Sequence, residues 1–319
     1  MPSSVQLGIA ANLAHLQTLG LNDRVQMHSV LEPGNRSHAP SQVHISTGRM
    51  AALKAANKAI DDTWEILLYG SGNQQGHVQS SRGESYKRTA LAYEFENRMD
   101  TGYSDPNYHQ AFVAASVQAG NCDQMADVNA LLLSVSGIHD RVSLVHANDV
   151  GHAFVSVGDE RMPGGAVISD AWPEFGRALL RRDFALAGHS PQTVRTYDVA
   201  YRPEVRENLL NAGKYSQHQI DESYAQVDPL RGTLDNDALT HSLLTSPDVK
   251  LYRQVHASQN LGVSYHNNGS TPQVVDQSLS MRQLNERLVR ASYPHVNLPP
   301  PTWEELLDFS VQNVEKKAA

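Results

Sequence analysis

The sequence has very little of several features that would place it in a structural class. It contains one cysteine in 319 residues, which excludes an intramolecular disulfide and a cysteine-rich zinc site. No run approaches the ~18–20 consecutive apolar residues that a membrane-spanning helix needs, so we expect no integral membrane segment. It also lacks a glycine-rich phosphate loop and any internal repeat, and therefore gives no sign of a nucleotide cofactor.

The sequence also has fewer basic residues than acidic ones. Lysine and arginine total 26 against 34 acidic residues, and the net charge of −8 argues against a nucleic-acid partner.

The start, Met1-Pro2-Ser3-Ser4, has no basic region followed by an apolar one, so no Sec signal peptide is expected. Fifteen histidines are present, but they do not show the spacing of a metal site on a convincing helix. We therefore predict no metal and no cofactor.

The single cysteine stands at a position that favours reactivity. Gly120-Asn121-Cys122 is a turn of short residues, and the apolar pattern from Cys122 to Ser136 predicts a helix. The positive end of a helix dipole and its unpaired backbone N–H groups stabilise a thiolate. The sequence therefore makes Cys122 a candidate nucleophile, although a lone cysteine is also commonly a small buried side chain.

A three-stranded antiparallel meander is predicted after this helix, over residues 142–146, 152–157 and 166–172. A loop centred near residue 161 would pair residues whose numbers sum to about 322. That register places His152 opposite Asp170, so the carboxylate can orient the imidazole.

These three residues predict a Cys-His-Asp catalytic set. Cys122 attacks a carbonyl carbon, His152 transfers the proton, and Asp170 fixes the tautomer of the imidazole. Asn121 is a candidate oxyanion donor beside the Cys122 backbone N–H, although a turn-forming asparagine without a catalytic role fits as well. Trp172 is expected to cover the catalytic pair, or to serve only as a core residue.

The motifs Gly-Asn-Cys at 120–122, Gly-His-Ala-Phe-Val at 151–155 and Val-Ile-Ser-Asp-Ala-Trp at 167–172 resemble the transglutaminase-like branch of the papain-like cysteine protease superfamily. Several secreted bacterial effectors, the AvrPphE-type effectors among them, resemble this pattern. The resemblance covers roughly residues 105–175 and implies the same triad. Asp123 stands where true transglutaminases often carry an aromatic residue, which leaves cross-linking specificity open.

We expect an α+β fold with three regions. Residues 1–45 are expected to be a flexible leader, whose polar composition suits a secretion signal and also many ordinary N-termini. Residues 46–200 are expected to form the catalytic core, and residues 201–319 a mainly helical C-terminal region packed on it. Residues 73–85 read as a polar, glycine-rich loop. The remaining expected helices span residues 7–19, 47–68, 86–99, 106–119, 178–184, 276–292 and 302–317, and a further strand spans 193–197.

The expected function is thiol chemistry on protein amide bonds. A cysteine protease is our first interpretation, with a glutamine deamidase or transglutaminase as the alternative, since all three begin with the same thioester. The acyl pocket and acceptor site are expected around residues 73–85 and 201–270. The resemblance implies a virulence effector that leaves a bacterium without a Sec signal, meets a host protein substrate in the host cytosol, and uses a secretion chaperone; otherwise the protein is cytoplasmic. From another class, the chain could be a non-enzymatic binding protein on a decayed scaffold.

Overall fold

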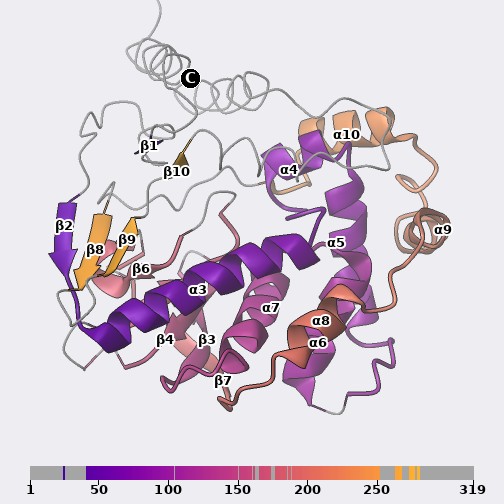
Figure 1. Cartoon of the computed structure of the whole chain (residues 1–319). Helices are drawn as coiled ribbons and strands as arrows, with labels where there is room; N and C mark the ends of the chain where they lie inside the picture. The colour runs from indigo at the N-terminus through magenta and orange to yellow at the C-terminus, as the bar shows by residue number, and fades with distance from the viewer. Residues whose placement is uncertain are drawn as a thin grey trace, which may run out of the picture.

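The computed structural model describes residues 24–25, 41–103, 105–149, 151–159, 161, 165–173, 177–184, 186–187, 189–251, 263–267, 273–276 and 279–280. Within these residues the chain has an α+β fold (Figure 1). The helices are α3 (Thr47–Ile66), α4 (Gln75–Ser80), α5 (Glu84–Phe95), α6 (Pro106–Val117), α7 (Cys122–Ser134), α8 (Glu204–Leu210), α9 (Gln217–Val227) and α10 (Asn236–Thr245), with a 3₁₀ turn η1 (Arg181–Asp183).

The main sheet has five antiparallel strands in the order β6-β5-β4-β3-β7. Its strands are β3 (Val142–Ala147), β4 (His152–Val157), β5 (Val167–Ser169), β6 (Leu179–Leu180) and β7 (Gln192–Tyr197). The predicted meander is therefore confirmed as β3-β4-β5, and the predicted strand at 193–197 is confirmed as β7. The third strand is shorter than expected, because the chain leaves the sheet at Asp170.

The predicted register of the meander is wrong by two residues. Val155 pairs with Ser169 and Val157 with Val167, so partner numbers sum to 324 instead of 322. The loop is centred one residue later than we expected. A shift of two residues keeps every side chain on the same face of the sheet, so His152 and Asp170 still face one another diagonally.

A second correction concerns residues 178–184, which were expected to be a short helix. Leu179 and Leu180 instead form β6, paired with Ile168 and Val167, and only Arg181–Asp183 turn into a 3₁₀ helix. Both leucines are buried. Burial against the sheet overrides helix propensity in so short a segment.

The helix α7 is the centre of the fold. Twelve of its residues are buried, because α3, α6 and the main sheet all pack against it (Figure 1). Two of its buried polar side chains bond the main sheet: Asp127 accepts from Arg195 and Tyr197, and Asn129 Oδ1 accepts from Ser169. A helix that is buried on all sides holds its first residue, Cys122, in a fixed place.

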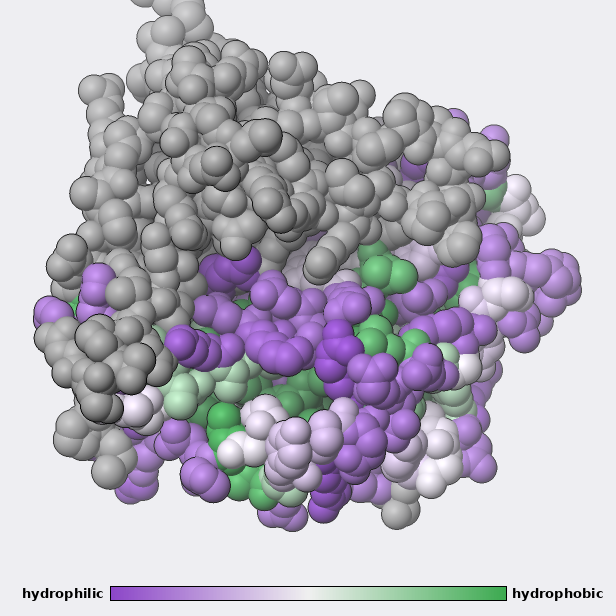
Figure 2. Space-filling view, in the orientation of Figure 1, coloured by the Kyte–Doolittle hydropathy of each residue, from purple (hydrophilic) through white to green (hydrophobic). Residues whose placement is uncertain are grey.

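The two helices beside α7 start where the sequence predicts. Ser46 caps α3 by accepting the Arg49 N–H, and Asp105 caps α6 ahead of Pro106. The helix α6 stops at Gln118, which takes the left-handed conformation with φ of 63°, and not at Gly120 as expected. In Figure 2 hydrophilic residues cover the outward side of α3, and hydrophobic residues show in the recess beneath it.

A second, smaller core joins α4, α5, α9 and α10. It is built from apolar side chains that include Val78, Leu91, Ile220, Tyr224 and Leu243. We expected residues 73–85 to be a polar loop, and this prediction is wrong. The segment contains α4 and buries Val78 in this core. Among the described helices, none is long and apolar enough to cross a membrane.

The predicted leader contributes ordered structure near its end. β2 (Ser41–His44) pairs in parallel with β8 (Val263–Asn267), which pairs in turn with β9 (Gln273–Asp276). β1 (Arg24–Val25) pairs with β10 (Leu279–Ser280). The helix predicted from residue 276 therefore does not begin there. The remainder of that helix, and the helices predicted at 7–19 and 302–317, lie outside the described residues.

Candidate active site

Three elements bring the predicted triad together. Cys122 is the first residue of α7, His152 is the first residue of β4, and Asp170 directly follows β5. All three are buried, with exposed fractions of 7%, 2% and 3%. β4 packs on α7 and pairs with β5, so the fold places the histidine between the thiol and the carboxylate.

The histidine and the aspartate are directly hydrogen-bonded. His152 Nε2 lies 2.7 Å from Asp170 Oδ2, which leaves Nδ1 as the ring nitrogen for Cys122. Burial opposes the charged imidazolium, but the Asp170 carboxylate and a hydrogen bond with Cys122 outweigh it and raise the pKa of His152 to about 10. The imidazole therefore keeps its proton at neutral pH, as a thiolate–imidazolium pair requires.

The start of α7 is fixed by its cap. The Asn121 N–H donates to Gln124 Oε1 at 2.9 Å, and Gln124 Nε2 donates to Glu96 Oε1 at 2.8 Å. The first N–H groups of a helix have no acceptor within the helix, so that of Cys122 is suited to an oxyanion. The side-chain amide of Asn121 donates instead to Tyr93 Oη at 3.3 Å.

Trp172 packs against the ring of His152. It is 2% exposed, and its ring centroid lies 5.1 Å from that of His152. Its backbone N–H donates to Asp170 Oδ1 at 3.1 Å, so the carboxylate is held by both His152 and Trp172. The tryptophan thus shields the histidine and orients the acid.

Sequence reasoning missed the residues that hold Trp172. Gln74 Nε2 donates to the Trp172 carbonyl, and Trp172 Nε1 donates to Ser71 Oγ and Asn73 Oδ1. These residues lie in a glycine-rich stretch that is typical of a surface loop. Long-range contacts of this kind leave no periodic signal in the sequence.

The residue that follows Cys122 in the chain forms a polar pair with β3. Asp123 Oδ1 lies 3.3 Å from His146 Nε2, and His146 Nδ1 hydrogen-bonds Asn148 at 2.8 Å. Asp123 is half-exposed, in contrast to Cys122 beside it. A polar pair thus includes the residue that follows the nucleophile.

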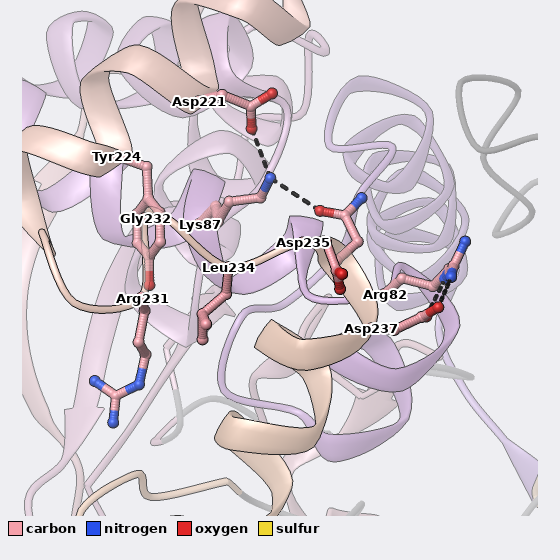
Figure 3. A pocket seen from close by; sticks show the side chains of 10 residues that line it. Arg82, Lys87, Asp221, Tyr224, Arg231, Gly232, Leu234, Asp235 and Asp237 are labelled. Carbon is pink, nitrogen blue, oxygen red and sulfur yellow. Dashed lines mark hydrogen bonds and ion pairs between the residues drawn. The ribbon is translucent and has the colours of Figure 1, made fainter.

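A cavity of about 440 Å³ lies elsewhere, between α5, α9 and α10 (Figure 3). Its walls come from both segments that were expected to supply the acyl pocket, and they include Arg82, Asp221 and Asp237. Lys87 points toward Asp221, and Arg82 toward Asp237 (Figure 3). None of the triad residues lines it, so this cavity is not the acyl pocket of Cys122.

Among the described residues, no group of three or more His, Cys, Asp or Glu side chains is arranged to hold a metal ion. No protein-family model matches the chain, and no curated protein or solved structure is significantly similar to it.

Proposed function

We propose that the protein is a thiol-dependent hydrolase or acyl transferase that acts on protein amide bonds. Cys122 is the nucleophile, His152 the acid and base, and Asp170 the orienting carboxylate. The observation that carries the proposal is the position of His152, which bonds Asp170 at 2.7 Å while Cys122 helps to raise its pKa. A papain-like or transglutaminase-like core, with the nucleophile at a helix N-terminus against an antiparallel sheet, fits this arrangement.

The proposed reaction has two half-reactions. The Cys122 thiolate attacks the amide carbonyl carbon, and the Cys122 N–H supports the oxyanion at the start of α7. His152 gives its proton to the leaving nitrogen as the C–N bond breaks, which leaves a thioester and a neutral imidazole. His152 then takes a proton from water or an amine, whose attack releases the acyl group and restores the thiolate. Asp170 holds the imidazole in orientation throughout.

Proteolysis is the first reaction to test, and the same triad serves the two alternative reactions. Glutamine deamidation and transglutamination begin with the same kind of thioester, formed from a glutamine side chain, which water resolves in the first reaction and an amine in the second. Mass spectrometry of candidate substrates separates the three: a cut chain, an amide converted to an acid, or two chains joined. The resemblance supplies the proposed setting, in which a bacterial effector acts on a host protein.

The alkylation rate of Cys122 against pH tests the triad without a known substrate. Cys122 is the only thiol, so intact mass reports on it alone. An ordinary thiol reacts with an apparent pKa near ~8.5, whereas a histidine-paired thiolate stays reactive well below pH ~7. We expect reactivity at low pH in the native protein. The low-pH reactivity should disappear in His152→Ala and weaken in Asp170→Asn.

A normal thiol titration that neither substitution changes would refute the proposed triad. The non-enzymatic binding protein would then be the better explanation of the fold. Far-UV circular dichroism of each variant ensures that a loss of reactivity reflects the site and not unfolding, since Cys122, His152 and Asp170 are all buried.

A further inference from the structure

One short segment touches both halves of the site. Residues 69–74, which we call the bridge, connect the end of α3 to the start of α4. On one side the bridge runs along the chain that precedes the nucleophile. The Tyr69 N–H donates to the Gln118 carbonyl at 2.9 Å, and the Gly120 N–H donates to the Gly70 carbonyl at 3.1 Å. These bonds fix the chain two residues before Cys122.

On its other side the bridge holds Trp172 by three hydrogen bonds. Gln74 Nε2 donates to the Trp172 carbonyl at 2.6 Å, and Trp172 Nε1 lies 3.0 Å from both Ser71 Oγ and Asn73 Oδ1. Trp172 in turn donates its backbone N–H to Asp170. The bridge therefore contacts the residue, Trp172, that directly bonds the Asp170 carboxylate.

These contacts close a ring around the site. The ring runs from Cys122 through His152, Asp170 and Trp172 to the bridge, and returns to Cys122 through residues 118–121. We infer that the bridge sets the separation of the Cys122 sulfur and the His152 imidazole, and that Gln74 is its main positioning residue. The inference rests on the proposed function of the triad and adds a residue to it.

Gln74 is suited to this role by its burial and its place in the chain. It is 2% exposed, it is uncharged, and its backbone forms the N-cap position of α4. Its 2.6 Å bond is the shortest of the three that hold Trp172. A neutral amide gives a directed hydrogen bond without adding a charge beside the thiolate–imidazolium pair.

The surroundings of the bridge leave it little freedom to move. A Cβ added at Gly72 would lie 2.6 Å from the Thr89 side chain and 2.7 Å from the Ser85 carbonyl, so the bridge lies directly on α5. The Gly72 N–H donates to Thr89 Oγ1, and the Ser71 N–H donates to His77 Nδ1, each at 3.1 Å. The bridge is thus held by α4 and α5, and it in turn holds Trp172.

The test is the pH profile of Cys122 alkylation in Gln74→Met, which keeps the volume and loses the amide donor. We expect the midpoint to move up by about one unit, which slows alkylation about tenfold below the midpoint. Gln219→Met is the matched control, because it makes the same exchange at an exposed glutamine of α9, whose amide oxygen accepts from Ser216 at the cap of that helix and not from the bridge. It should leave the midpoint unchanged.

A second variant separates positioning from folding. Gln74→Glu keeps the shape of the side chain but faces the Trp172 carbonyl with an acceptor, and it should move the midpoint at least as far as Gln74→Met. If neither variant folds, Ser71→Ala removes one bond to Trp172 together with the Ser71 Oγ bonds to Asn73 and Asn121, and it should move the midpoint in the same direction. An unchanged midpoint in folded Gln74→Met, with low-pH reactivity intact in the native protein, would overturn the inference. An ordinary titration in the native protein would refute the triad itself.

Discussion

Two buried histidines take opposite protonation states because their neighbours differ. Burial disfavours the charged form of both. For His77 nothing compensates, and its pKa falls to about 3, so Nδ1 is free to accept the Ser71 N–H. For His152 the Asp170 carboxylate and Cys122 outweigh burial and raise the pKa to about 10. One histidine is therefore suited to hold structure, and the other to carry a proton.

The lowered pKa of His77 predicts a loss of stability in acid. Between pH 3 and about 6.5 the unfolded chain binds a proton at this residue that the folded protein does not, so the free energy of unfolding falls as the pH drops. The slope contributed by one such group is about 1.4 kcal/mol per pH unit. In His77→Gln, urea unfolding between pH 4 and 6 should show a slope smaller by about this amount.

His218→Gln is the control for that measurement. His218 is an exposed histidine on α9 beside Glu222, and its removal should leave the acid slope nearly as it is. Equal slopes for His77→Gln and the native protein would contradict the assigned neutral state of His77.

The residues of the triad were predictable because each carries a local signal. Cys122 follows a turn and opens a helix, while His152 and Asp170 stand at the ends of apolar strands that turns or loops separate. Gln74 and Ser71 have no such signal. They are polar residues in a glycine-rich stretch, and only the folded chain shows that Trp172 lies against them.

At the scale of elements, caps and apolar periodicity were sufficient for α3, α5, α6 and α7, whose ends lie within a few residues of the predicted ones. The shortest segment that depends on a distant partner, β6, was not predicted as a strand. β6 is two leucines long and exists because β5 lies beside it. The register of β4 and β5 depends on a loop whose exact centre the sequence does not specify.

Polar side chains of α5 are buried where this helix packs against its neighbours. Glu84 and Arg88, both 2% exposed, form an ion pair on this helix. Arg88 also donates to the Val117 carbonyl and to Gln217 of α9, and its guanidinium lies 3.7 Å above the Tyr69 ring. One arginine thus ties α5 to α6, to α9 and to the bridge.

Arg88→Met should therefore destabilise the protein strongly. Glu84 keeps Lys87 as an ion-pair partner, but the Val117 carbonyl and Gln217 lose this buried donor, at a cost of about 1–3 kcal/mol. Urea denaturation measures this loss. Arg98→Met is the matched control, because Arg98 is exposed and pairs with Glu94 across one helical turn, where such pairs contribute about 0.3–0.5 kcal/mol. Similar losses in both variants would show that Arg88 is not held in the buried cluster.

At the scale of the whole molecule, the described chain has a main core around α7, a second core of α4, α5, α9 and α10, and a small sheet of β2, β8 and β9. The small sheet joins segments more than two hundred residues apart. Its parallel pairing could not be foreseen, because each strand is short and its partner is distant in the sequence.

Tyr265 attaches the small sheet to the main one. It is fully buried on β8, donates its hydroxyl to Asp183 Oδ2 at 2.7 Å, and accepts the Leu180 N–H of β6 at 3.0 Å. Burial and the neighbouring Asp183 carboxylate both raise the pKa of this phenol, so it stays neutral and keeps its proton for the aspartate. The hydroxyl thus satisfies a donor and an acceptor at the edge of the main sheet.

Tyr265→Phe tests whether this one hydroxyl keeps the two sheets together. The substitution keeps the ring in the core but leaves the buried Leu180 N–H without this acceptor and Asp183 without this donor, at a cost of about 1–3 kcal/mol. Hydrogen exchange should then accelerate at the amides of β2 and β8 before those of β3 and β4, because the small sheet separates without unfolding α7. Tyr201→Phe, at a largely exposed tyrosine, should change neither set. Uniform acceleration over both sheets would mean instead that the small sheet and the main sheet unfold as one cooperative unit.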